Sequence, residues 1–473
     1  MNQSHTNTFF GKKENPCFKR RGLMLDVSRN RVPKMHTLKR LINALKILKY
    51  NELQLYTEHS FAYSDHQVVW EGASPITHEE VREIDAYCSE RGIELIPNQN
   101  SFGHMERWLK HEQYKGLAEC PNGFEHPISG WRTCGSTLYP SKESLTFIDK
   151  IYAELVPNYK SNQLHVGGDE PWELGKGRSK KRVDKEGKHH VYIDFMQELF
   201  NLSKKHGCEP QFWADIILEN PDLVSKLPEA VNPVIWGYEA DHPFDQQCEI
   251  LARAGFRNQY YVAPGAANWN SFSGRLDLAE TNIHQAAKYG CLHNAKGLLL
   301  TAWGDNGYHQ PWLTLYPPLI IAAAATHGVS LSRTKLAEQI DLIFFSEFES
   351  GHGAAICALG EIDSLLPQPA GPNSFLHSSF FADDIELEEK LRPLASRTMI
   401  ANCQCALDAI PTEGLDQEIS LAVRLNRAGI ERILGREASE DYEKLTGDFI
   451  RQWRRHSREG GLADSVALLA AKT

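Results

Sequence analysis

The sequence predicts an α/β protein in which a (β/α)8 TIM barrel is followed by a mainly helical C-terminal region. Eight short runs rich in apolar and β-branched residues recur between residues 22 and 304 of the 473-residue chain. Segments with the apolar periodicity of amphipathic helices separate most of these runs, which is typical of parallel βαβ units. Polar and aromatic residues cluster at the end of nearly every run, where TIM barrels carry their active sites.

Each apolar run is predicted to be one strand of the barrel. An open doubly wound sheet is the structural alternative, but no glycine-rich phosphate loop follows the first run. In chain order the predicted strands are residues 22–28, 52–58, 94–100, 163–170, 210–215, 232–238, 259–265 and 298–304.

The intervals between the strands carry helix signals. Leucine and isoleucine residues of 37–49 recur at i, i+3, i+4 and i+7, which places them on one helix face. Residues 78–91 follow Thr77, an N-cap residue with Glu80 at the capping-box position. The other predicted barrel helices are residues 144–155, 191–206, 243–254, 278–289 and 315–327.

Loops and a second region complete the predicted organisation. Residues 101–142 form a long loop after the third strand, and the Lys-, Arg- and Gly-rich residues 175–190 are predicted to be a mobile exposed loop. A Pro- and Gly-rich turn cluster at 367–373 lies within the helical region. Amphipathic helices are predicted there at residues 385–394, 415–434 and 442–455. The predicted divisions are an N-terminal extension (1–20), a catalytic barrel (21–330) and a C-terminal helical region (331–473).

Composition excludes several classes of protein. The net charge of −10 argues against nucleic-acid binding, which needs a basic surface. No apolar run approaches the ~18 residues of a membrane span. Residues 1–21 are polar and then basic, without the apolar stretch of a secretory signal. Ten singly scattered cysteines are therefore expected to be reduced thiols in a cytoplasmic protein.

The ends of the predicted strands and their following loops carry the candidate site residues. Aromatic side chains stack on the C–H faces of sugars, whereas arginine and carboxylates bind vicinal hydroxyls. This mixture favours a carbohydrate ligand over a phosphate or nucleotide. Although a single tryptophan near a strand end is more often core than site, four at equivalent positions make that interpretation weaker. The candidates are Arg29, Glu58, His104, Asp169, Glu170, Trp213, Asp215, Trp236, Tyr261, Trp269, Trp303 and Asp305.

Asp169 and Glu170 are the candidates with the clearest chemistry. Adjacent carboxylates at a ligand site push their pKa values apart, which leaves one as an acid and the other as an anion. The two preceding glycines permit an unusual backbone or the close approach of a ligand. Asp215, by contrast, is also suited to capping the next helix. No metal or other cofactor is predicted, since the sequence has no HExxH motif. A serine hydrolase is disfavoured too, because no Gly-x-Ser-x-Gly motif is present.

These motifs resemble those of glycoside hydrolase family 20, the β-N-acetylhexosaminidases. The resemblance covers residues 21–329, and the C-terminal tail is similar to that of the smaller, hexosaminidase D-like members. It rests on the motifs ²¹Arg-Gly-Leu-Met-Leu-Asp-Val-Ser-Arg, ¹⁶⁵His-Val-Gly-Gly-Asp-Glu and ³⁰³Trp-Gly-Asp, on Phe-Gly-His104, and on the tryptophans that end the fifth and sixth strands.

The resemblance implies a mechanism in which the 2-acetamido oxygen of the sugar is the nucleophile, and not a protein carboxylate. Glu170 matches the family's acid/base, and Asp169 matches the carboxylate that orients the acetamido group. Arg29 and Asp305 match groups that hold the outer hydroxyls, and His104 matches a histidine of a polar relay. Trp213, Trp236 and Trp303 match the pocket walls.

Other positions match the family less closely. Glu58 lies where larger members have an acidic pair. The acetamido-binding tyrosine has two candidates, Tyr261 and Tyr238, and Trp269 lies on the same side.

The function expected from this resemblance is exo-hydrolysis of terminal β-linked GlcNAc or GalNAc from an amino-sugar glycoside or oligosaccharide. The protein is expected to be cytoplasmic, and a homodimer is one of its candidate oligomeric states. Two alternatives stay open at this point: a non-catalytic barrel that binds amino sugars, and a retaining β-glycosidase with a protein nucleophile. A membrane or nucleic-acid partner is not expected.

Overall fold

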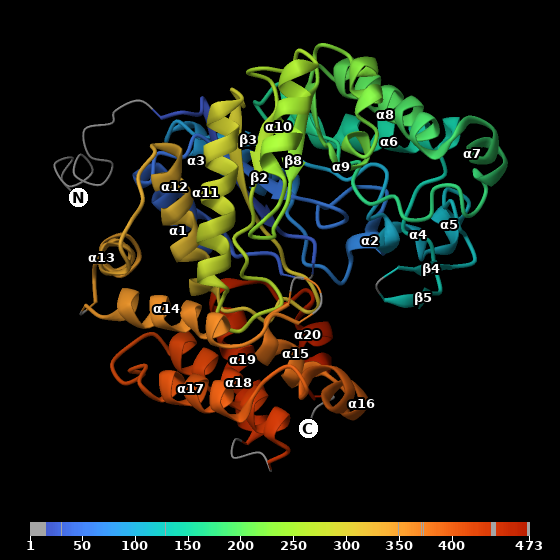
Figure 1. The fold of residues 1–473 in the computed structure, drawn as a ribbon. Coiled ribbons are helices and arrows are strands. Elements are labelled where there is room, and N and C mark those ends of the chain that lie inside the picture. The colour runs from blue at the N-terminus through green and yellow to red at the C-terminus, as the bar shows by residue number, and fades with distance from the viewer. Residues whose placement is uncertain are drawn as a thin grey trace.

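The eight predicted strands form one parallel sheet that closes into a barrel (Figure 1). The computed structural model describes residues 16–470, except 30, 128, 349, 370, 372 and 437–440. The strand order is β3-β2-β1-β10-β9-β8-β7-β6, and a parallel bridge between Asn98 and His165 joins the two end strands. The closed TIM barrel is therefore confirmed over the open sheet. The strands are β1 (Arg20–Asp26), β2 (Glu52–Tyr56), β3 (Glu94–Ile96), β6 (Gln163–His165), β7 (Glu209–Trp213), β8 (Asn232–Trp236), β9 (Tyr261–Ala263) and β10 (Gly297–Ala302).

Helices cover the outside of the barrel close to where the apolar periodicity predicts them. Thr77 and Glu80 form the predicted capping box at the start of α3, with both reciprocal hydrogen bonds present. The barrel helices and the short 3-10 helices beside them are α1 (Met35–Ile47), α3 (His78–Ser89), α6 (Lys142–Leu155), η2 (Val156–Asn158), α8 (Lys188–Lys205), α9 (Asp215–Leu218), η3 (Pro221–Lys226), α10 (Phe244–Arg253), α11 (Leu276–Leu292), η4 (Trp312–Leu315) and α12 (Tyr316–Thr326).

The loops after the strands contain more structure than the sequence indicated. The long loop after β3 folds into α4 (Glu106–Leu109), α5 (Glu112–Lys115) and a two-stranded antiparallel hairpin of β4 (Phe124–His126) and β5 (Gly130–Arg132). The prediction of a loop throughout residues 175–190 is wrong, because α7 (Lys180–Glu186) forms there. Ion pairs between side chains four residues apart, such as Lys180–Asp184, accompany this charged helix. A further short helix, α2 (Gln67–Trp70), lies between β2 and α3.

The C-terminal region is mainly helical, as predicted, and its last helices gather at one end of the barrel (Figure 1). One continuous apolar core contains Leu25 and Leu300 of the barrel together with Leu336, Phe375 and Ile419 of this region. The region is therefore packed onto the barrel through shared core residues. Its helices are α13 (Arg333–Phe344), α14 (His352–Glu361), η5 (3-10, Ile362–Leu365), α15 (Phe375–Phe381), α16 (Asp384–Glu386), η6 (a π-helix, Leu387–Leu391), α17 (Arg397–Asp408), α18 (Gln417–Leu434), α19 (Tyr442–His456) and α20 (Leu462–Ala470).

The expectation that every cysteine is a free thiol is wrong. Cys17, just before β1, forms a disulfide with Cys291 near the end of α11, and their Cα atoms lie 5.8 Å apart. The other eight cysteines are free. The pairing was not visible in the sequence because 274 positions separate the two residues. Among the described residues, no helix is both long and apolar enough to cross a membrane.

Candidate active site

The adjacent carboxylates Asp169 and Glu170 follow β6 after a turn with unusual backbone angles. Gly167 and Gly168 adopt positive φ angles of 76° and 102°, and Glu170 itself has φ 46°. Residues with side chains rarely adopt these angles, whereas glycine does so readily. The turn replaces the alternation of a strand, so that two consecutive side chains share one environment. This confirms the role expected for the two glycines.

A close backbone approach holds the carboxylate turn in place. Gly103, in the loop after β3, lies so near that a Cβ atom there would be 2.5 Å from the carbonyl oxygen of Asp169. His104 follows with a positive φ of 55°. The absence of a side chain at Gly103 therefore lets the loop after β3 bring His104 against the carboxylates.

His104 lies against both carboxylates. Its Nε2 atom is 3.1 Å from Oδ2 of Asp169 and 3.6 Å from Oε2 of Glu170. Burial by itself would lower the pKa of His104, but the Asp169 carboxylate outweighs burial and raises it to about 9. The imidazole is therefore a cation at neutral pH, and it faces the two groups expected to divide acid and anion roles.

The two carboxylates have pKa values that move in opposite directions. Burial raises the pKa of Glu170, and the Asp169 charge raises it further against the opposing effect of His104. Burial also acts to raise the pKa of Asp169, but His104 holds it below its ordinary value. Glu170 therefore holds a proton more readily than Asp169, as expected for an acid beside an anion.

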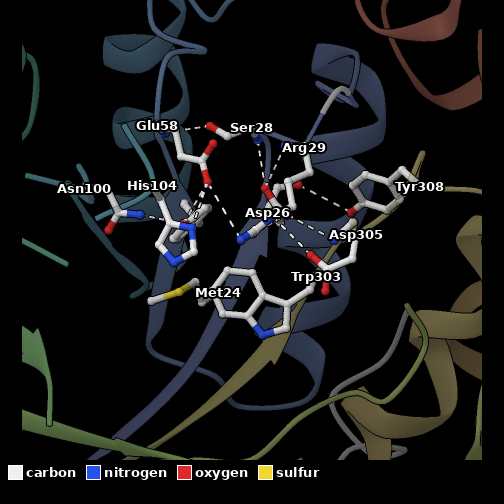
Figure 2. A network of polar contacts seen from close by, with 12 residues as sticks. Met24, Asp26, Ser28, Arg29, Glu58, Asn100, His104, Trp303, Asp305 and Tyr308 are labelled. Atoms are coloured by element: carbon white, nitrogen blue, oxygen red, sulfur yellow. Dashed lines mark hydrogen bonds and ion pairs between the residues drawn. The ribbon is translucent and has the colours of Figure 1, made fainter. Parts of the chain in front are cut away.

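Arg29 joins the loops after β1, β2 and β10. Its guanidinium lies 3.1 Å from Asp26, 3.1 Å from Asp305 and 3.8 Å from Glu58. Figure 2 shows these side chains pointing toward one another. Asp26 is fully buried and also accepts a hydrogen bond from the backbone of Gly304, 3.0 Å away. The ends of β1 and β10 are therefore tied together through one carboxylate, which orients Arg29 and Asp305 as a unit.

Glu58 is buried and held by its neighbours. Tyr56 donates a hydrogen bond to its Oε1 atom at 3.0 Å, and Asn100 in turn donates to Tyr56. Burial raises the pKa of Glu58. His104 Nδ1 is 4.0 Å from the same Oε1 atom, so Glu58 lies behind His104 relative to Asp169.

Aromatic rings line the region beside these charges. The ring centroid of Trp303 lies 4.7 Å from that of Tyr56, in an edge-to-face contact, and 6.1 Å from that of Trp213. The Arg29 guanidinium carbon is 5.1 Å from the Trp303 centroid. The indole N–H of Trp213 is buried and has no hydrogen-bond partner among the described residues. Two of the predicted tryptophans, Trp213 and Trp303, thus lie beside the charged groups at one end of the barrel, together with Tyr56, which was not predicted.

Tyr238 extends this aromatic group. The indole N–H of Trp303 donates to the Tyr238 hydroxyl at 2.8 Å. The Tyr238 ring stacks on Trp236 with ring centroids 5.2 Å apart, and it contacts Trp269 edge-on with centroids 5.0 Å apart. The predicted tryptophans therefore come together, with Tyr238 at their centre.

Tyr261 does not lie in this group. It is the first residue of β9, and its hydroxyl donates to Glu52 at the start of β2, 3.2 Å away. That end of the strands is opposite the end that carries Asp169. Of the two tyrosines considered for the acetamido group, the geometry favours Tyr238 and corrects the choice of Tyr261.

Asp215 is a site residue that the sequence left open. It is the first residue of α9, and the N-cap position belongs to Ala214, so Asp215 does not cap that helix. Burial raises its pKa to about 8, with further contributions from the charges of Asp169 and Glu170. Its position two residues after Trp213 was the only signal in the sequence.

The C-terminal region supports the rim of the site. Arg31, two residues after Arg29, is buried, and its guanidinium lies 4.9 Å from the Trp453 ring of α19. It donates to Oγ of Ser457 at 3.0 Å and to the carbonyl of Gln310 at 2.8 Å. The loop that begins with Trp303 and Asp305 is thereby fastened to α19.

A second buried contact holds the same loop. Glu418 of α18 accepts backbone hydrogen bonds from Trp312 and Leu313, at 3.1 and 3.2 Å. The loop after β9 is held too, because Ser374 donates to the carbonyl of Asn270 beside Trp269. Loops after three strands are therefore positioned by residues more than one hundred positions away in the sequence.

Comparisons with known proteins identify the family of this chain. Residues 18–257, just over half of the chain, match the model of the glycosyl hydrolase family 20 catalytic domain. Human hexosaminidase D is 24% identical over 313 residues, which are 62% of this chain and 62% of that protein.

Solved structures share the fold. An exo-β-N-acetylglucosaminidase of Vibrio harveyi, solved with N-acetylglucosamine, is 17% identical with a TM-score of 0.55, over 70% of this chain and 58% of its own. A chitobiase of Flavobacterium johnsoniae is 18% identical with a TM-score of 0.54, over 97% of this chain and 78% of its own. The fold, the carboxylate turn and the family match lead to one conclusion: this chain belongs to glycoside hydrolase family 20.

Proposed function

We propose that this protein is an exo-acting β-N-acetylhexosaminidase that removes terminal β-linked GlcNAc or GalNAc by a substrate-assisted retaining mechanism. The observation that carries the proposal is the carboxylate turn: Asp169 and Glu170 are adjacent, face His104 together, and have pKa values shifted in opposite directions. Family membership and the similarity to human hexosaminidase D support it.

In the first step, the acetamido oxygen of the substrate attacks the anomeric carbon and forms a cyclic oxazolinium ion. The bond from the anomeric carbon to the leaving oxygen breaks, and that oxygen takes a proton from Glu170. Asp169, held as an anion by His104, orients the acetamido N–H and stabilises the positive charge that develops there. One of its oxygens, Oδ1, is buried without a partner among the described residues.

In the second step, water attacks the anomeric carbon, and Glu170, now a carboxylate, takes a proton from the water. The bond from the anomeric carbon to the oxazolinium oxygen breaks, which restores the acetamido group. The sugar leaves with its original anomeric configuration. Adjacent carboxylates suit this scheme because no protein nucleophile is needed on the opposite face of the sugar.

The remaining residues are assigned to binding. Arg29 and Asp305 would hold the outer hydroxyls of the sugar, because they are fixed against one another at 3.1 Å and both are partly exposed. Trp213, Trp236, Trp269 and Trp303 would form the walls around the sugar and its acetamido group. Tyr238 would donate its hydroxyl proton to the acetamido oxygen, since the hydroxyl already accepts from Trp303.

Glu170→Gln tests the function directly. The amide keeps the shape of the side chain but is not acidic enough to protonate the leaving oxygen. Hydrolysis of an aryl β-GlcNAc glycoside should therefore fall by about 10²-fold or more. Wild-type rates in this variant would refute the assignment of Glu170. A thiazoline analogue of the oxazolinium ion should inhibit the wild-type enzyme.

The same experiments separate the alternatives. Binding of GlcNAc with no turnover by the wild-type protein would favour a non-catalytic barrel. Hydrolysis of β-glucosides that lack the acetamido group, without thiazoline inhibition, would favour a protein nucleophile. Parallel kinetics with aryl GlcNAc and GalNAc substrates measure the sugar preference.

We further propose a cytoplasmic protein that acts without nucleic acid or a membrane and forms a homodimer. The eight free cysteines favour a reducing compartment, whereas the Cys17–Cys291 disulfide favours an oxidising one. Cell fractionation decides between these compartments, and light scattering measures the oligomeric state.

A further inference from the structure

Trp172 lies two residues after Glu170 and outside the aromatic group described above. Its backbone N–H donates to the carbonyl of Glu170 at 2.7 Å, which closes a tight turn around Pro171. The next residue, Glu173, is buried and accepts hydrogen bonds from the backbone and hydroxyl of Ser136, at 2.8 and 3.0 Å. The backbone at Trp172 is therefore held on both sides, by the turn from Glu170 and by the buried Glu173.

Trp172 is partly exposed, and its ring has one aromatic neighbour among the residues that the structure describes. His126 of β4 contacts it edge-to-face, with ring centroids 5.8 Å apart. The β4–β5 hairpin thus brings an aromatic residue of the loop after β3 against the loop after β6. Burial, then the charge of Arg132, lower the pKa of His126, and His104 is close enough to lower it further. The ring pair is uncharged at neutral pH, and His126 lies within electrostatic range of His104, the cation that faces both carboxylates.

The position of the leaving group follows from the proposed function, on which this inference rests. Glu170 gives its proton to the oxygen that joins the two parts of the substrate, so the departing part must lie beside the Glu170 carboxyl. The tryptophans around Tyr238 are assigned to the sugar that is cleaved off. Trp172 belongs to the same tight turn as Glu170 and is a partly exposed aromatic residue not assigned to that sugar.

We infer that Trp172 and His126 form a binding platform for a saccharide leaving group. A pyranose ring presents a flat C–H face that stacks on an indole, and it carries no charge to require an ionic partner. An uncharged aromatic platform matches this chemistry. A peptide or simple alkyl leaving group presents no such rigid face, so the preferred substrate is an oligosaccharide with a β-linked terminal amino sugar.

Two substrates with the same terminal GlcNAc test this platform. One is the β1,4-linked disaccharide of GlcNAc, and the other is methyl β-GlcNAc, whose leaving group has no ring. Trp172→Ala should lower kcat/KM for the disaccharide by about tenfold more than for the methyl glycoside. Trp172→Phe keeps an aromatic face and should retain most of the difference between the two substrates.

Trp131 provides the matched control. It lies on β5, is 63% exposed, and pairs across the hairpin with Glu125. Since neighbouring residues of a strand point to opposite faces, Trp131 faces away from the side that carries His126. Trp131→Ala should leave both kcat/KM values within about twofold of wild type, since single exposed aromatic residues contribute little.

A binding experiment separates this inference from the proposed function. With turnover suppressed by Glu170→Gln, calorimetry should show the disaccharide bound about tenfold more weakly when Trp172 is also alanine, with free GlcNAc binding unchanged. Equal losses for both ligands, or no loss for either, would overturn the platform. A serine-linked GlcNAc peptide that loses as much affinity as the disaccharide would overturn the saccharide preference. Failure of the proposed function alone would appear as a wild-type protein that binds the disaccharide and cleaves neither substrate.

Discussion

Replacing His104 with glutamine removes the cation that faces both carboxylates. In the wild-type protein the pKa of His104 rises from 6.5 to about 9, which corresponds to roughly 3 kcal/mol of net stabilisation of its charged form. The attraction between the charges is mutual, and because burial opposes it at His104, the carboxylates lose at least this much stabilisation when the cation is removed. Asp169 is the nearer partner, at 3.1 Å against 3.6 Å for Glu170. If Asp169 receives about half of the coupling, its pKa should rise by about one unit.

The pH profile of kcat/KM measures this shift. Activity requires Asp169 as an anion, so the acid limb should move to higher pH by about one unit in His104→Gln. Activity also requires Glu170 as an acid, and because His104 lowers the Glu170 pKa, the basic limb should move upward as well. His189→Gln is the matched control, because His189 pairs with Glu219 on the outside of the barrel and should leave both limbs in place.

The outcome is specific to the proposed electrostatics. A lower rate with unchanged limbs would mean that His104 acts only by shape, and would refute the coupling.

The pH dependence of stability gives a second readout. Because the pKa of His104 is raised on folding, its contribution is complete below pH ~6.5 and is lost as the pH rises through about 9. The difference in unfolding free energy between wild type and His104→Gln should therefore shrink across that interval.

Two further substitutions test the roles of Tyr238 and Arg31. Tyr238→Phe keeps the stacked ring but removes the hydroxyl, so kcat on aryl β-GlcNAc should fall by about 10- to 100-fold, and steady-state kinetics with a wild-type kcat would contradict its role. Arg31→Met leaves the buried carbonyl of Gln310 and the hydroxyl of Ser457 without their donor, which should lower the unfolding free energy by about 2–4 kcal/mol in urea titrations. An unchanged denaturation midpoint would show that Arg31 does not fasten the rim to α19.

Much of the barrel was predictable because its signals are local. All eight strands and all seven predicted barrel helices form close to their expected positions, since apolar periodicity and capping residues act over a few neighbouring residues. The same holds for the carboxylate turn. Gly167, Gly168, Asp169 and Glu170 are consecutive, so their order already limits the backbone and brings both acids to one strand end.

Short-range signals were weaker in the loops after the strands. Helix α7 is stabilised by ion pairs within a charged segment that has no apolar stripe. The β4–β5 hairpin has only three residues in each strand, too few for a clear alternation. The contact between His126 and Trp172, on which the proposed platform depends, was therefore not predictable from the sequence.

The depth of a residue along its strand depends on the register of the sheet. Tyr261 and Tyr238 both belong to predicted strands, at residues 259–265 and 232–238, and either suited the acetamido group by sequence. Pairing of Tyr261 with Gly297 at the start of β10 places it at the opposite end of the barrel from Asp169. Tyr238 lies two residues beyond the end of β8 and reaches Trp303.

The amino-acid sequence by itself determined the strands, the helices that surround them, and the pair of adjacent carboxylates at the end of β6, because each arises from neighbouring residues. Only the tertiary structure decided which tyrosine joins the site, that Cys17 meets Cys291, and that Arg31 fastens the site to α19. The physical reason is distance along the chain: Arg31 and Ser457 are 426 positions apart. Contacts of that range are set by how the barrel closes and by what packs on its open end.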